Sequence, residues 1–130
     1  MTAVLAHFLD PGHALGAACE SEWDASAVVE TPGEDARCRI VLRRDGDRGL
    51  RAAFAAFGPP EVIACADWLC ERVDGKRVGT VKHLVVKDLE QALSLGPTQR
   101  YAGAMVVDAF NQAIRILERL RYERNDDEWQ

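Results

Sequence analysis

The chain has 130 residues, of which 48% are hydrophobic, and a formal net charge of -5. This length fits one domain with one core, and the acidic balance argues against nucleic acid as the main partner. No stretch approaches the roughly 20 apolar residues needed to cross a bilayer, and the N-terminus lacks the basic segment of a secretory signal. The four cysteines have no framework spacing, so we expect reduced thiols in a cytoplasmic protein.

The first part of the chain is predicted to form a short helix over residues 3–9, ended by Asp10-Pro11-Gly12. Residues 17–25 are irregular in pattern and carry a small acidic patch of Glu20, Glu22 and Asp24. The segment 26–31 has the composition of a strand and stops at Pro32-Gly33.

Two alternating segments follow, and both are predicted to be strands. In 37–44, Cys38, Ile40 and Leu42 share one face, and arginines with Val41 occupy the other. In 50–57, Leu50 and every second residue after it share a face. The turn sequence Asp45-Gly46-Asp47 lies between them, which predicts an antiparallel hairpin.

The second half of the chain is predicted to be helical. One helix begins at Pro59 and ends near Asp74-Gly75, and one helix or two short ones span 81–95. The last helix runs from about Thr98 to Arg124, and residues 125–130 form a frayed tail. Strands followed by helices predict one α+β domain over residues 1–130. It has a small three-stranded antiparallel sheet, helices on one face and a long C-terminal helix.

Cys65 and Cys70 lie on the helix that begins at Pro59, five positions apart. At about 100° per residue they point roughly 140° apart, so they cannot hold one ion together. Cys65 shares an apolar stripe with Val62 and Leu69 and is predicted to be a core residue, with Cys70 near the edge of the stripe. The chain contains no Cys-x-x-Cys motif of the redox or zinc type.

Four segments, taken in order, resemble the U-type iron–sulfur scaffold family, which includes IscU and the N-terminal domain of NifU. They are HFLDPGHALG (7–16), the hairpin at 33–58, PPEVIACADWLCERVDGK (59–76) and LGPTQRYAGAMVVDAFNQAI (95–114). The resemblance runs from about His7 to Leu117 and rests on the order and spacing of these segments. It implies the fold described above and a role in iron–sulfur cluster assembly.

The resemblance also implies where cluster ligands would lie. The family uses three cysteine thiolates and an aspartate near the first of them. The first cysteine corresponds to Glu34, the aspartate to Ala36, the second cysteine to Pro59 and the third to Ala102. The histidine before the third cysteine corresponds to Tyr101, and the chaperone-binding loop to 95–99, where only Leu95 and Pro97 match. The start of a helix on Pro59 is explained if that position belongs to a replaced ligand, since proline suits the first turn.

Other metal-binding arrangements are less favoured by the sequence. His7, His13 and His83 are scattered without a second ligand at a suitable spacing. A hard-oxygen and thiol site of Glu34, Cys38 and Cys65, with Cys70 as a further donor, remains an alternative. On an extended strand the Cα atoms of Glu34 and Cys38 would stand roughly 13 Å apart, so such a site needs a turn near Asp35.

Arginines are concentrated in the hairpin, and four of them form a candidate docking face: Arg37, Arg39, Arg43 and Arg51. A solvated outer sheet face explains them, and so does a surface for an acidic protein partner. No phosphate loop, nucleophile motif or acid–base pair is present, so we expect no enzyme activity.

The sequence therefore predicts a scaffold-like protein that has lost its cluster ligands. We expect it to bind protein partners in iron–sulfur or sulfur-transfer pathways, without a cofactor, nucleic acid or membrane. The alternatives are a carrier of a cluster or zinc with unconventional ligands, and a small-ligand-binding protein that uses the emptied pocket. The oligomeric state and the identity of the partner are not indicated.

Overall fold

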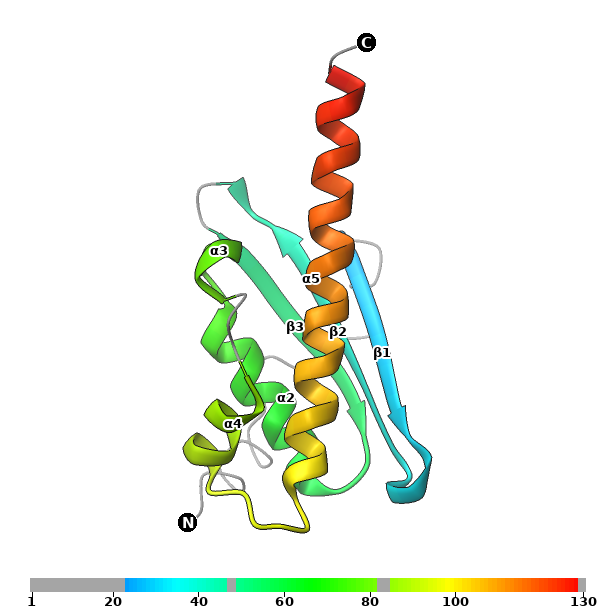
Figure 1. Ribbon diagram of the computed structural model, residues 1–130, viewed down its shortest axis with the longest axis vertical. Coiled ribbons are helices and arrows are strands. Elements are labelled where there is room, and N and C mark those ends of the chain that lie inside the picture. Colours follow the sequence, from blue (N-terminus) through cyan, green and yellow to red (C-terminus); the bar gives the residue numbers. More distant parts are fainter. Residues whose placement is uncertain (1–22, 47–48, 82–84, 129–130) are drawn as a thin grey trace.

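The computed structural model describes residues 23–46, 49–81 and 85–128, with side chains described as far as residue 120. Three strands and the helices that follow them form an α+β fold, as the sequence predicts (Figure 1). No helix within these described residues is both long and apolar enough to cross a membrane.

The sheet has the order β1-β2-β3, with β1 at Ala25–Thr31, β2 at Ala36–Arg44 and β3 at Leu50–Phe57. Both pairings are antiparallel, which confirms the predicted hairpin. Alternation works as predicted: Cys38, Ile40 and Leu42 of β2 are fully buried, and Phe54 of β3 faces the same core. Two outward residues differ, since Val41 and its cross-strand partner Ala53 are also buried, at 2% and 8% exposure.

The major helices cover one face of the sheet, α2 (Pro60–Val73) against β3 and α5 (Arg100–Glu128) against β1 and β2 (Figure 1). Their apolar faces meet in a single core that contains Leu69 of α2 and Phe110 of α5. Between them lie α3 (Val78–Val81) and α4 (Val86–Leu93). Of the one or two helices expected at 81–95, α4 lies within that range, whereas α3 shares only Val81 with it.

The C-terminal helix is longer than the sequence analysis expects. It continues to Glu128, past the expected end at Arg124, and extends beyond the sheet (Figure 1). The frayed tail expected at 125–130 stays a prediction. The sequence contains no glycine or proline after Gly103, so nothing in its composition breaks the helix. The helix expected at 3–9 lies outside the described residues, as do His7, His13 and His83.

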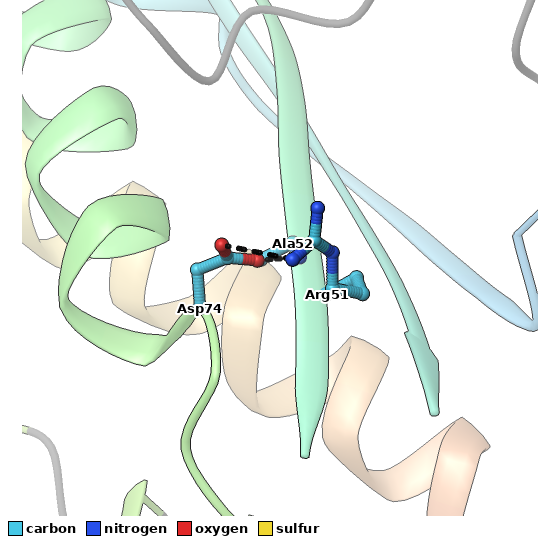
Figure 2. A network of polar contacts seen from close by, with 3 residues as sticks. All are labelled: Arg51, Ala52 and Asp74. Carbon is cyan, nitrogen blue, oxygen red and sulfur yellow. Dashed lines mark hydrogen bonds and ion pairs between the residues drawn. The ribbon is translucent and has the colours of Figure 1, made fainter. Parts of the chain in front are cut away.

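The end of α2 is tied to the edge of β3. The Asp74 carboxylate accepts a hydrogen bond from the Ala52 N–H at 3.1 Å, and its second oxygen lies 3.8 Å from the Arg51 guanidinium (Figure 2). Leu50 continues this edge pairing, donating its N–H to Lys76 and accepting from Gly75. These bonds occupy one end of the edge strand, where unpaired backbone groups would otherwise be open to other chains. We call this region the turn end.

Candidate functional site

The four positions that the resemblance in the sequence assigns to cluster ligands lie at the end of the molecule opposite the turn end. Glu34 belongs to the short 3₁₀ turn η2 (Pro32–Glu34), Ala36 begins β2, Pro59 precedes α2 and Ala102 lies in the first turn of α5. These segments gather at the lower end of the view in Figure 1. We call this region the rim.

Backbone contact brings Ala36 next to the start of α2. Gly58 has φ +137°, and a Cβ placed on it would lie 2.9 Å from the Ala36 Cβ. Glycine is therefore required at 58 both for its conformation and for the close approach. Pro59 follows directly and occupies the N-cap without a side-chain cap, as the absence of Ser, Thr, Asp or Asn predicts.

Tyr101 joins the first turn of α5 to the first turn of α2. Its hydroxyl donates a hydrogen bond to Glu61 Oε1 at 3.1 Å. Burial, followed by the negative charge of Glu61 and its hydrogen bond, raises the pKa of Tyr101 to about 12, with smaller contributions from Glu34 and Cys65. The phenol therefore stays protonated at neutral pH and acts as a donor.

The side chains at the four positions do not fit an iron–sulfur cluster. Ala102 is fully buried and Ala36 is 5% exposed, and neither residue has a donor atom. Pro59 has none either, which leaves Glu34 as the one possible ligand. Clusters need several soft thiolate ligands that converge on one site. The rim instead presents carboxylates and a neutral phenol.

The thiols lie in the interior of the fold. Cys38, Cys65 and Cys70 are all 0% exposed, so the prediction that Cys65 is a core residue is confirmed. Burial raises the pKa of Cys38 to about 12, and burial with the nearby Cys38 raises that of Cys65 to about 12. Burial is also the main reason that the pKa of Cys70 is raised. Cys38 thus lies near both helix thiols, and all three stay protonated at neutral pH.

The turn that a Glu34–Cys38 site would need is present, since Asp35 adopts the left-handed conformation with φ +50°. Cys38 nevertheless faces the core, while Glu34 is exposed. Within residues 23–46, 49–81 and 85–128, no three His, Cys, Asp or Glu side chains are grouped to hold a metal ion.

The candidate arginine face is divided among several contacts. Arg37 pairs with Glu30 across the strands at 2.7 Å, and Arg51 approaches Asp74. Arg43 is half-buried, and its guanidinium lies 5.5 Å from the ring centre of Trp23. Arg39 is half-buried as well. Arg51 and Arg43 are direct cross-strand neighbours, so the positive charge is densest toward the turn end.

The segment that corresponds to the chaperone-binding loop is a tight turn before α5. Gln99 accepts a hydrogen bond from the Gly96 N–H through its side chain at 3.2 Å and donates its own N–H to the Gly96 carbonyl. Leu95 is 7% exposed and packs in the core, whereas Pro97 is exposed.

Two residues of the rim are not singled out by the sequence. Glu61 is 40 positions from the tyrosine it binds, and no sequence pattern links such a pair. Phe57 is 65% exposed at the end of β3. Strand alternation does contain this signal, because it places Phe57 opposite the buried face of Leu50, Ala52 and Phe54.

The three-stranded sheet with helices on one face defines a small α+β domain, and comparison with known proteins supplies its family. The model of the NifU-like N-terminal domain matches residues 1–123. The chain therefore belongs to the NifU-like N-terminal domain family, which confirms the resemblance seen in the sequence.

Solved structures support the same fold. A crystal structure of a hypothetical protein is similar at a TM-score of 0.59, with 18% identity over 87% of this chain and 94% of the other. At this identity the similarity shows the fold alone. A search of curated proteins found no match to the chain.

Proposed function

We propose that this protein is a member of the iron–sulfur scaffold family that has lost its cluster ligands. In this proposal it acts without catalysis, as a binding or regulatory partner in iron–sulfur or sulfur-transfer pathways. The supporting observation is the rim: the family match covers the rim segments, and none of the four corresponding positions carries a thiol. A fold can persist when its site is replaced, so family membership alone does not assign cluster assembly.

The position of the remaining sulfur supports the same proposal. Metal ligation by cysteine requires the thiolate, and burial keeps Cys38 and Cys65 protonated, with pKa values of about 12. To reach the rim these thiols would have to leave the core between β2 and α2. We therefore propose that the protein carries no resident metal or cofactor.

The proposal also covers the kind of partner and the cellular location. The partners are proteins, because the rim and the outer sheet face carry charged residues of both signs that suit protein interfaces. The negative net charge of -5 is unfavourable for nucleic acid. We place the protein in the cytoplasm, where thiols stay reduced.

One observation favours a second candidate, a carrier of a cluster or zinc with unconventional ligands. Glu34 and Cys65 both contribute to the raised pKa of Tyr101, so a carboxylate and a thiol both lie near this phenol. A carrier would have to expose Cys65, together with Cys38 or Cys70, on loading.

Anaerobic purification and reconstitution test the proposal. We expect the protein to contain no stoichiometric iron or zinc. After treatment with iron, sulfide and reductant and then desalting, it should show no stable sulfur-to-iron charge-transfer bands. A stable stoichiometric cluster in the unchanged protein would replace this proposal with the carrier.

A second experiment introduces the family's ligand residues at the four rim positions and asks whether the protein then binds a cluster. The variant Glu34→Cys, Ala36→Asp, Pro59→Cys and Ala102→Cys should gain at least weak cluster binding, since it returns three thiolates to one rim. The matched control adds three thiols at exposed positions away from the rim, Gln91→Cys, Asp108→Cys and Arg115→Cys. Circular dichroism checks the fold of both variants. A folded rim variant that binds no more iron than the control would show that these positions do not form a ligand set.

A further inference from the structure

A hollow of about 540 Å³ lies beside the rim, on the side of the sheet that the helices leave uncovered. It is lined by Glu30, Pro32, Asp35, Ala36, Arg37 and Phe57. The register explains the grouping, since Glu30, Arg37 and Phe57 are direct neighbours across the three strands. Phe57 is the most exposed large apolar side chain in the described part of the chain, at 65%. We call this hollow the Phe57 groove.

The surroundings of the groove are negative. Arg37 is its one cation, and the Arg37 Nε lies 2.7 Å from Glu30 Oε1, so these two charges neutralise each other. Glu34 and Asp35 remain on the adjoining turn, both exposed, and their carboxylates make no hydrogen bond or ion pair to any described residue. Glu61 adds a third carboxylate at the rim, where it accepts from Tyr101.

The same carboxylates affect Tyr101 beside the groove. Burial is the main reason that the pKa of Tyr101 is raised, and the charges of Glu61 and Glu34 raise it further. Asp35 itself adopts the left-handed conformation, and its backbone N–H donates a hydrogen bond to the Pro32 carbonyl at 3.2 Å. Its backbone position, and with it the start of its side chain, is therefore fixed by the turn. The groove therefore joins an exposed aromatic ring to uncommitted carboxylates on a short turn.

We propose that the Phe57 groove binds a basic segment of a partner protein through an arginine side chain. Arginine fits both halves of the groove: its planar guanidinium stacks on aromatic faces and pairs with carboxylates, and its apolar stem lies along apolar surface. The ring of Phe57 and the prolyl ring of Pro32 receive the stem, and Asp35 and Glu34 receive the charge. An acidic segment would meet like charge at the same place.

This inference rests on the proposed binding function and names the chemistry of one partner. It also separates this partner from one that would dock on the arginine face, because the η2 turn carries Glu34 and Asp35, whereas Arg43 and Arg51 are neighbours across the strands near the turn end.

Peptide binding to the full chain tests the groove. The probe is a fluorescein-labelled dodecapeptide of glycine and serine with a central Arg-Leu-Arg, and the reference peptide carries Ser-Leu-Ser there. Fluorescence anisotropy at low ionic strength should show binding of the arginine peptide at least about fivefold tighter than the reference, falling as salt is added. Equal binding of the two peptides, or no binding of the arginine peptide, would overturn the proposal.

Matched variants locate the binding. Asparagine tolerates the left-handed turn, so Asp35→Asn removes charge and keeps the backbone. Phe57→Ser removes the ring, and Phe57→Leu keeps apolar area without it. Asp35→Asn and Phe57→Ser should each lower the affinity for the arginine peptide about two- to fivefold. Phe57→Leu should lose most of the affinity that the aromatic ring contributes.

Two controls make the same chemical changes on α5. Asp108→Asn removes one exposed carboxylate, and Ile116→Ser removes one exposed apolar side chain; both should leave the affinity unchanged. If Asp108→Asn weakens binding as much as Asp35→Asn, bulk charge explains the binding and the groove does not. The reconstitution experiment is independent of these results: a cluster in the unchanged protein defeats the proposed function, whereas absent peptide binding without a cluster defeats only the groove.

Discussion

The two ends of this molecule use their polar groups in opposite ways. At the turn end, Asp74 accepts from the Ala52 backbone, and Gly75 and Lys76 exchange hydrogen bonds with Leu50. At the rim, the Tyr101–Glu61 hydrogen bond joins α5 to α2, but the side chains of Glu34 and Asp35 are exposed and make no hydrogen bond or ion pair to a described residue. The Asp74 carboxylate at the turn end therefore ties a helix to the sheet, whereas the two carboxylates of the η2 turn do not hold the described elements together.

The comparison also shows that the structure of the rim does not depend on sulfur. The rim positions are held by backbone geometry, such as the approach of Gly58 to Ala36, and by burial of Ala102. None of these constraints needs a thiol. Core positions differ, because Cys38, Cys65 and Cys70 fill volume between the sheet and α2.

The largest difference in stability between the two ends is expected when a glycine at each end is replaced by alanine. A Cβ on Gly49 would lie 2.6 Å from the Lys76 carbonyl oxygen, at φ +84°, so Gly49→Ala should destabilise the fold by at least about 2 kcal/mol. Gly58→Ala should also destabilise, but Ala36→Gly should rescue part of that loss, because the blocking atom at the rim is a side-chain carbon. Urea unfolding of the single and double variants measures this. Rescue of Gly49→Ala by Ala36→Gly would contradict the assignment.

The next largest loss of stability is expected from substitution of a buried cysteine. Cys65→Ser would place a hydroxyl in the apolar core, at a cost of roughly 1–3 kcal/mol. In the native protein at pH 8, Cys38, Cys65 and Cys70 should react slowly with a thiol reagent, because burial blocks access and raises each pKa. The denatured protein, in which all four thiols are open, provides the control. Rapid native labelling of Cys65, with no loss of stability on substitution, would show that it is not a core residue.

Removal of the Asp74 carboxylate tests the support at the turn end directly. Asp74→Ala leaves the Ala52 N–H without its acceptor and should cost about 1 kcal/mol. Glu34→Gln at the rim should change the free energy of unfolding by less than about 0.5 kcal/mol, since it breaks no described hydrogen bond. Equal losses in the two variants would remove the distinction between the ends.

The titration of Tyr101 measures the field at the rim. Its pKa is raised from 10.0 to about 12, so the folded state favours the protonated phenol. The stability that this provides is fully present below pH 10 and is lost as the pH rises toward 12. Absorbance titration of a Tyr122→Phe protein isolates Tyr101, and Glu61→Gln should lower its pKa toward 10. An unchanged pKa in Glu61→Gln would mean that burial alone causes the shift.

The smallest effect is expected on the rate at which an acidic partner associates with the arginine face. Arg39→Glu with Arg43→Glu should slow association with a glutamate-rich peptide severalfold at low salt, because exposed charges steer encounter. The control, Arg115→Glu with Arg119→Glu, makes the same change of charge on α5. Stopped-flow fluorescence compares the two, and equal rates would mean that net charge, and not this face, controls the association.

The sequence by itself determined the strands, the hairpin and the helix that starts after Pro59. These are local features: alternation in β2 and β3, a turn at Asp45-Gly46, and proline in the first helical turn depend on near neighbours. The burial of Cys65 is also determined locally, through its place on the stripe with Val62 and Leu69. The same local reasoning misjudged the end of α5, where helix propensity continues past Arg124.

Only the tertiary structure decided which residues meet at the rim. Glu61 and Tyr101 are brought together by the packing of α2 beside α5, and Phe57 meets Pro32 and Asp35 because the strand register places the end of β3 beside the β1–β2 turn. Such contacts depend on the relative positions of whole elements, which are set by burial of their apolar faces. The spacing of the contacting residues along the chain therefore does not reveal them.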